Sequence, residues 1–430
     1  MTLPVKRIIG TLASESGAVV LTAIAGFYML HVFPKAEYGI YAFFIATVNL
    51  IIGLSEIGIN HCFLPTVGSD NVTPAKVGAV MHLFLKRRFT LILISSLIVV
   101  PVTLYLAYRQ SWLTPWTFSA FALMLLSIGL SVNEQLWRMG FTALKQTKAI
   151  GKATVSNAFT RFAWIIGMAF SIKGSMLMLP MAASGLLGSA AGLAVYRRSN
   201  LGGLVIASER EELQTSLEER FQKIYSPLWV PALSWVLYTN FGNLAIGWFA
   251  KVETVADVNA AGRLVMVLMI IDKMVGVFVL PLLAQYKTEA EYWNSLIPLQ
   301  LVYIIGVGAL VFSAWWLPDL WLLLLGNKYS NLAPLLWLAM LGPVLANASG
   351  FTFSCLASRG YTGNQMPILS AAILVNVFLI MSLGMATARN AFLINAICSA
   401  ALAVGQWTLM LKWFIHFKRL ATRKSATSIS

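Results

Sequence analysis

Long apolar runs, separated by short polar stretches, repeat along the whole chain of 430 residues. The hydrocarbon core of a bilayer is crossed by about 20 residues of α-helix. The pattern therefore predicts an all-α polytopic membrane protein with about twelve transmembrane helices, six in each half. The expected spans are 8–32, 38–60, 89–108, 115–137, 154–172, 175–196, 226–250, 260–284, 296–318, 332–357, 366–387 and 391–416.

Composition supports a membrane location. Hydrophobic residues make up 58% of the chain and charged residues 11%, whereas a soluble domain carries roughly 25% charged residues. The chain has too little charge to cover a water-facing surface. Because twelve spans leave only short loops, a large soluble catalytic domain is excluded.

The positive charge is distributed in a way that indicates topology. The formal net charge is +15, but the cations fall in short clusters between apolar runs. Such clusters anchor cytoplasmic loops and argue against nucleic acid as a partner. With the N-terminus inside, 22 of the 31 Lys and Arg residues lie on the cytoplasmic side and 6 on the outer side. We therefore expect both termini to be cytoplasmic, a retained first helix instead of a signal peptide, and a topology anchor at 76–88.

A longer polar segment, 197–225, joins the two halves. Leu213, Leu217, Phe221 and Tyr225 recur at intervals of four, as on one face of an amphipathic helix. We expect this helix to lie on the inner membrane surface, with a solvated linker helix as the alternative. The expected organisation is an N-terminal six-helix bundle (1–196), a cytoplasmic amphipathic linker (197–225), a C-terminal six-helix bundle (226–416) and a cytoplasmic basic tail (417–430).

Short similarities between the halves suggest an internal duplication. The segment 33–42 opens span two and 254–261 opens span eight, while 142–144 and 354–356 match at a similar separation. This order predicts two six-helix halves that run in the same direction and are related by an axis along the membrane normal.

Three motifs carry a resemblance to a known family: FPKAEYGIY at 33–41, FVLPLLAQ at 278–285 and LLGNKYSNLAPLL at 324–336. With them, the sequence resembles the Wzx-like, polysaccharide-exporting branch of the multidrug/oligosaccharidyl-lipid/polysaccharide (MOP) exporter superfamily. The sequence departs from the pattern at Asn259, which stands where the first half has Gly39.

The resemblance implies a V-shaped pair of six-helix bundles around a central cavity that works by alternating access. It further implies a flippase for lipid-linked oligosaccharides of the undecaprenyl pyrophosphate type in the bacterial inner (cytoplasmic) membrane, serving O-antigen or exopolysaccharide biosynthesis. Its expected partners are this substrate and membrane lipids, and polysaccharide assembly proteins are left open as further partners.

Charged residues inside spans are the first candidates for a transport site, because each costs roughly 2.5 to 3.5 kcal/mol at a span centre. Arg161 offers a planar donor fork for a phosphate or an acidic sugar. Glu15 lies at a similar depth and is a candidate for ion coupling or for accepting a sugar hydroxyl. The alternative for both is a structural ion pair, and Glu134 with Arg138 has the spacing of an ordinary helical ion pair.

The second half supplies further candidates. Asp272 and Lys273 lie near the middle of span eight, where Asp272 is an ion-coupling candidate and Lys273 a substrate-binding candidate. Arg263 is a weaker substrate candidate, because it lies nearer the outer end and can reach the headgroups. Asn240 and Asn243 in span seven can bind sugar hydroxyls, although amides also join helices.

The sequence contains no motif for built-in catalysis. There is no GxxxxGK[ST] loop and no HExxH, and the four histidines and three cysteines are dispersed. We therefore expect no catalytic residue, no metal and no cofactor. A drug or cation antiporter of the same superfamily remains the alternative in transport. A polytopic glycosyltransferase or polymerase is disfavoured, because the predicted outer loops are short and hold few acids.

Overall fold

The computed structural model describes residues 5–68, 72–172, 174–199, 211–275, 288–357 and 365–427, together with 279, 283 and 286. Inside these ranges, the side chains of 5–9, 11–12, 174–175, 211–215, 241, 243–244, 267, 270, 273–274 and 419–427 are not described. Every regular element of the described residues is helical, which confirms the predicted all-α class.

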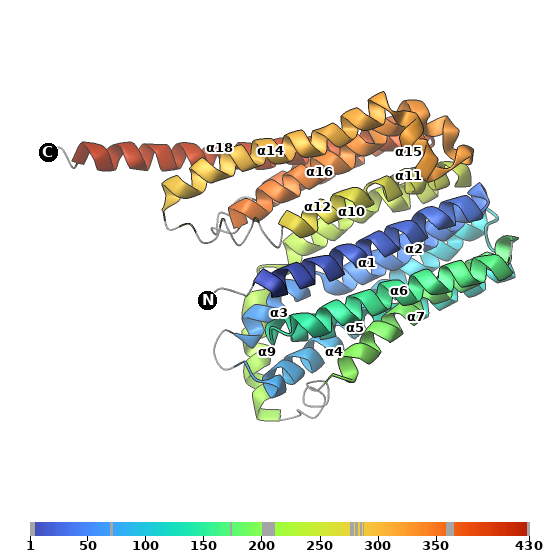
Figure 1. Ribbon diagram of the computed structural model, residues 1–430, viewed down its shortest axis with the longest axis horizontal. Coiled ribbons are helices and arrows are strands. Elements are labelled where there is room, and N and C mark those ends of the chain that lie inside the picture. Colours follow the sequence, from blue (N-terminus) through green and yellow to red (C-terminus); the bar gives the residue numbers. More distant parts are fainter. Residues whose placement is uncertain are drawn as a thin grey trace. The chain divides into compact units, whose positions relative to one another are not determined.

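Each predicted span falls on a helix in its described part (Figure 1). Span eight is divided, because α11 ends at Leu264 and α12 starts at Met266. The helices up to α10 are α1 Val5–Val32, α2 Lys35–Glu56, α3 Ile59–Val67, α4 Pro74–Arg109, α5 Pro115–Ala143, α6 Thr147–Ser171, η1 Gly174–Leu177, α7 Met178–Arg197, α9 Glu211–Tyr225 and α10 Trp229–Phe249. The helices from α11 are α11 Val252–Leu264, α12 Met266–Met274, α14 Glu289–Trp316, α15 Pro318–Leu325, η3 Asn327–Leu335, α16 Leu336–Ala357, α17 Gln365–Leu383 and α18 Ala388–Thr427.

Several helices have the length and surface that a bilayer requires. Among the described residues, nine helical segments are long and apolar enough to cross a membrane. Leu93 and Leu97 of α4 are 71% and 76% exposed, a burial pattern that suits lipid contact and not water. The chain is therefore a multi-pass membrane protein.

The chain forms two compact units, Met1–Asn259 and Ala260–Ser430, and the boundary falls inside α11. The first unit continues past the predicted linker because α10 packs against α2. In the second unit, α16 packs against α14 and α18 around the buried Tyr292, Trp293 and Leu296. The predicted division into bundles at 1–196 and 226–416 stays a prediction.

The helix that contains predicted span three starts well before that span. Thr73 caps α4 by accepting the backbone N–H of Lys76 at 3.2 Å, and Pro74 follows at the first position of the helix. The basic segment 76–88 therefore belongs to the helix and not to a loop. Hydropathy sees only the apolar part of such a helix, which extends beyond the bilayer core.

The linker helix α9 corrects another expectation. Leu217 and Phe221 are buried in one core with residues of α3, α4 and α5, so their face is covered by protein and not by a membrane surface. The ring of Phe84 meets Phe221 edge-on with the ring centroids 5.0 Å apart, and Arg87 forms an ion pair with Glu218. The prediction of membrane contact is wrong for these residues, and Leu213 lies outside the described side chains.

The motif at 33–41 has a local packing role. A Cβ added at Gly39 would lie 3.0 Å from Val252 Cγ2, so glycine permits the close approach of α2 to the start of α11. Lys35 and Asp257 form an ion pair at 2.6 Å across the same contact. Asn259 instead donates to the carbonyl of its own helix at Val255. The motif at 278–285 lies almost wholly outside the described residues.

Candidate functional site in the first unit

Four helices of the first unit bring polar side chains together. Helix α6 packs against α1 and α7, and α7 also packs against α5. Gly188 and Gly192 of α7 make room for this cluster, because a Cβ at Gly188 would lie 2.7 Å from Arg161 Cδ and one at Gly192 would lie 2.8 Å from Glu134 Cδ. The small residues of α7 therefore let long charged side chains enter an otherwise apolar bundle.

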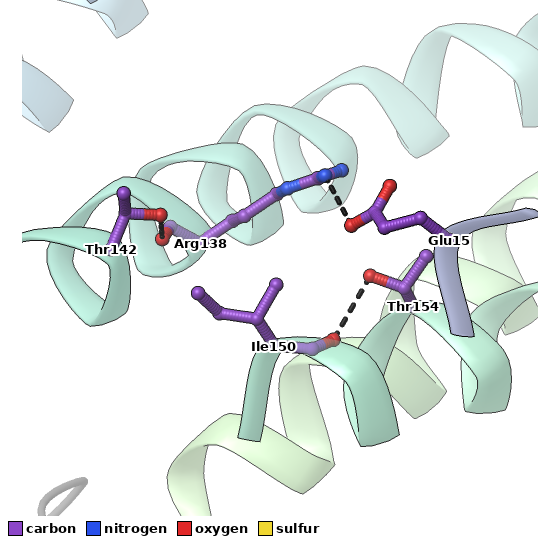
Figure 2. A network of polar contacts seen from close by, with 5 residues as sticks. All are labelled: Glu15, Arg138, Thr142, Ile150 and Thr154. Atoms are coloured by element: carbon purple, nitrogen blue, oxygen red, sulfur yellow. Dashed lines mark hydrogen bonds and ion pairs between the residues drawn. The ribbon is translucent and has the colours of Figure 1, made fainter. Parts of the chain in front are cut away.

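Glu15 of α1 forms an ion pair with Arg138 of α5 at 2.5 Å, and Figure 2 shows the two side chains pointing toward each other. Glu15 is 7% exposed, so the buried carboxylate depends on this guanidinium for its charge balance. Two sequence interpretations are corrected here. Glu15 pairs with Arg138 and not with Arg161, and Arg138 is therefore not the helical partner of Glu134.

Glu134 is held by neutral groups. The Asn157 Nδ2 group donates to both carboxylate oxygens, at 2.8 and 2.7 Å. The nearby Ser189 hydroxyl of α7 lies 3.1 Å from the Ser131 hydroxyl of α5. Arg138 and Arg161 both exert an attractive field on Glu134, but neither forms an ion pair with it. The interpretation of Glu134 as one member of a simple ion pair is therefore wrong.

Arg161 contrasts with its neighbours. Within the described part of the chain, no atom accepts a hydrogen bond from its guanidinium and no carboxylate lies within ion-pair distance. The side chain is half-buried, and its aliphatic part lies against Gly188. A guanidinium has five N–H donors, so those of Arg161 are available to water or to an anionic ligand.

Arg88 of α4 is a second arginine that enters the helix bundle, although the sequence interpretation treated it as part of a topology anchor. It is 0% exposed and donates to Gln135 at 3.0 Å, Ser55 at 3.3 Å and Asn60 at 3.5 Å. Its charge is also favoured by Glu56. The cluster of basic residues at 86–88 concealed this role, because hydropathy does not show which of them turns inward.

Of the two candidate amide residues of α10, the structure describes the side chain of Asn240 alone. Asn240 donates to the Val236 carbonyl at 2.9 Å and to the Thr239 hydroxyl at 3.1 Å. Its amide nitrogen therefore serves its own helix. The side chain of Asn243 lies outside the described residues.

The second unit holds a separate polar group around Asp272 of α12. Asn347 of α16 donates to Asp272 at 2.9 Å, and the Tyr303 hydroxyl of α14 bonds to Asn347 and, at 3.5 Å, to Asp272. Phe351 stacks on Tyr303 with the ring centroids 4.1 Å apart. Asp272 is nevertheless exposed, and Asn347 and Tyr303 help to orient its carboxylate.

The structure says less about the two cationic candidates of the second unit, Arg263 and Lys273. Arg263 lies half-buried in the last turn of α11. Lys273 follows Asp272 in α12, but its side chain is outside the described residues. Among the described residues, no group of three His, Cys, Asp or Glu side chains is placed to hold a metal ion.

Comparison with solved structures places this geometry in a known fold. No protein-family model matches the chain, and no curated protein sequence matches it. An inward-facing multidrug resistance MATE family transporter of the MOP superfamily is similar over 96% of this chain and 94% of its own, with a TM-score of 0.67 and 14% identity. The chain has the fold of these transporters. The lipid II flippase MurJ in an inward closed conformation is similar over 93% of this chain and 86% of its own, with a TM-score of 0.66 and 12% identity. A MATE transporter in complex with MaD3S reaches a TM-score of 0.55 at 13% identity.

The first unit holds the Arg161 guanidinium, which has no acceptor among the described residues, near the Glu134 carboxylate, which accepts hydrogen bonds from Asn157. Such a fork can bind a phosphate or carboxylate in two parallel hydrogen bonds. The second unit offers a carboxylate held by an amide and a phenol, which can bind a cation or exchange a proton. The described residues thus place a guanidinium in the first candidate site and a carboxylate in the second.

Proposed function

We propose that this protein flips lipid-linked oligosaccharide units of the undecaprenyl pyrophosphate type across the bacterial inner membrane by alternating access. In this role it serves surface polysaccharide biosynthesis, with both termini in the cytoplasm. It carries out no covalent chemistry, and the substrate's lipid tail stays in the bilayer while the headgroup crosses.

Arg161 is the observation that carries the proposal. Its guanidinium lies among the packed helices of the first unit with no protein acceptor among the described residues, while the neighbouring carboxylates already have partners. A pyrophosphate supplies the paired oxygens that this fork fits. Lys273 is proposed as a second cationic contact, Asn240 and Asn243 as contacts for sugar hydroxyls, and Arg263 as a contact nearer the headgroups.

The fold similarity is consistent with this substrate class. One of the similar structures is a lipid II flippase, so the same architecture accommodates a lipid-linked headgroup in that protein. Fold alone does not define a substrate, and the weight of the proposal therefore rests on the site.

Deletion of the gene in its host tests the proposal. Completed lipid-linked oligosaccharide should accumulate on the inner leaflet, surface polysaccharide should be lost, and the wild-type gene should restore both. Normal export in the deletion strain would refute an essential flipping role. Export of a cationic dye is measured in the same strains, because a loss of dye export alone would favour the other candidate.

That other candidate is a drug or cation antiporter, and the exposed carboxylate of Asp272 in α12 favours it. An antiporter would need Asp272 for its cationic substrate or its coupling ion, whereas Arg161 would be dispensable. Asp272→Asn keeps the shape and removes the charge. If this variant abolishes dye export while Arg161→Ala leaves it intact, antiport is the better description.

A further inference from the structure

Asn157 lies between two opposite charges of the first unit. Its amide nitrogen bonds both oxygens of Glu134, and it precedes Arg161 by one helical turn on α6. A Cβ at Gly188 would lie 2.8 Å from Asn157 Oδ1 and 2.7 Å from Arg161 Cδ, so both side chains cover the same glycine. Glu134, Asn157 and Arg161 are therefore immediate neighbours.

Of the two arginines whose charge Glu134 attracts, one already forms an ion pair. Arg138 is engaged by Glu15 at 2.5 Å, which leaves Arg161 as the near cation without an ion pair among the described residues. Glu134 attracts Arg161, as it attracts Arg138. Without the Asn157 donors, the half-satisfied carboxylate of Glu134 would take the guanidinium of Arg161 as its partner, because an unsatisfied buried charge is costly.

We propose that Asn157 is a specificity-determining positioning residue, which occupies Glu134 with a neutral amide and so keeps the Arg161 guanidinium open for an anionic ligand. The inference rests on the proposed function only for the identity of that ligand, a lipid-linked pyrophosphate. The positioning role itself does not depend on the ligand, because it states that the Arg161 guanidinium stays accessible when the Asn157 amide occupies Glu134.

Chemical labelling of the full-length protein in detergent measures this openness directly. Phenylglyoxal condenses with accessible guanidinium groups, and a labelled Arg161 is no longer cleaved by trypsin, so the peptide 153–161 disappears from the digest. Wild-type protein should lose this peptide readily. Asn157→Leu, which keeps the volume and removes the amide, should slow its loss about tenfold, since an ion pair would now hold the guanidinium.

Rescue by a second substitution separates positioning from folding. Glu134→Gln removes the competing charge, so the double variant Asn157→Leu/Glu134→Gln should label at the wild-type rate. A general distortion of the bundle would not be repaired in this way. Asn259→Leu is the matched control, because among the described residues Asn259 donates to its own helix alone, and it should not change the labelling of Arg161.

Farnesyl pyrophosphate, a short isoprenoid pyrophosphate, links the inference to the proposed function. It should protect Arg161 in wild type and in the double variant, and it should need about tenfold higher concentration in Asn157→Leu. Wild-type labelling of Arg161 in Asn157→Leu, failure of the double variant to recover, or an unreactive Arg161 in wild-type protein would each overturn the inference. If the labelling pattern holds but farnesyl pyrophosphate gives no protection, the positioning role stands and the proposed substrate class fails.

Discussion

The first unit contains two arginines, Arg88 and Arg161, with opposite surroundings. Arg88 is 0% exposed and donates to three neutral side chains from α2, α3 and α5. Arg161 is half-buried, and no acceptor for it occurs in the part of the chain that the structure describes. The same residue type thus joins helices in one place and presents open donors in the other.

The difference shows that the supply of acceptors, and not the presence of a charge, separates a structural arginine from a candidate binding arginine. Arg88 bonds Ser55 at the end of α2 and Asn60 at the start of α3, so it holds the two sides of the break at Gly58, where φ is +76°. The negative end of the α2 dipole also favours a cation at this point. Arg161 forms no comparable set of hydrogen bonds with the residues that the structure describes.

The largest effect is expected at Arg88. Arg88→Ala removes three hydrogen bonds and leaves a cavity in the core, so it should lower the free energy of unfolding by about 3 kcal/mol or more. Thermal unfolding in detergent measures the loss. Arg87→Ala is the matched control, because the ion pair of Arg87 with Glu218 is about half exposed. Equal stability of the Arg88 and Arg87 variants would break the comparison.

Arg161 should show the reverse behaviour. Arg161→Ala should reduce flipping about tenfold or more, since charged hydrogen bonds to the substrate are lost, and it should leave the unfolding temperature close to that of wild type. Lys273→Ala should also impair transport. Both proteins must still insert in the membrane. Full activity of both variants would favour a purely structural role for these cations.

The glycines of α7 allow a finer test. A Cβ at Gly188 would crowd Arg161 and Asn157, whereas a Cβ at Gly185 would lie 3.9 Å from Arg161 Nη2, an ordinary contact. Gly188→Ala should therefore reduce transport several-fold and Gly185→Ala should not, in the same flipping assay. If the two variants transport equally, the position of Arg161 does not depend on the surface of α7.

The smallest effect is expected at the ion pair that fixes α9. Arg87→Glu should cost about 1 kcal/mol or less, because the pair is partly exposed, and the charge swap Arg87→Glu/Glu218→Arg should recover most of it. Thermal unfolding of the three proteins provides the measurement. A larger loss than that of Arg88→Ala would reverse the ranking of the two neighbouring arginines.

Sequence reasoning predicted the helices because a membrane imposes long apolar runs on every span. All the predicted spans fall on helices. The part of α4 before residue 89 was not predicted as helix, because it is basic and lacks a long apolar run. Asp272 was identified from its position in an apolar span. Its partners Tyr303 and Asn347 lie on other helices and could not be identified in this way.

The sequence did not predict which charged and polar side chains of the site pair with one another. The pairing of Glu15 with Arg138 joins residues 123 positions apart, and it depends on how α1 and α5 are rotated about their axes. Hydropathy contains no information on that rotation. The same reason explains why Arg88 was taken for a loop anchor and why the bond from Asn157 to Glu134 was missed.

Reconstituted vesicles provide the most direct measurement of the central claim. A fluorescent isoprenoid pyrophosphate-linked disaccharide is placed in both leaflets, and dithionite, which does not cross the membrane, quenches the outer pool. Wild-type protein should make nearly all of the probe reachable, while Arg161→Ala should leave the inner pool protected as in protein-free vesicles. A protected inner pool with wild-type protein, or equal quenching by both proteins, would contradict the account.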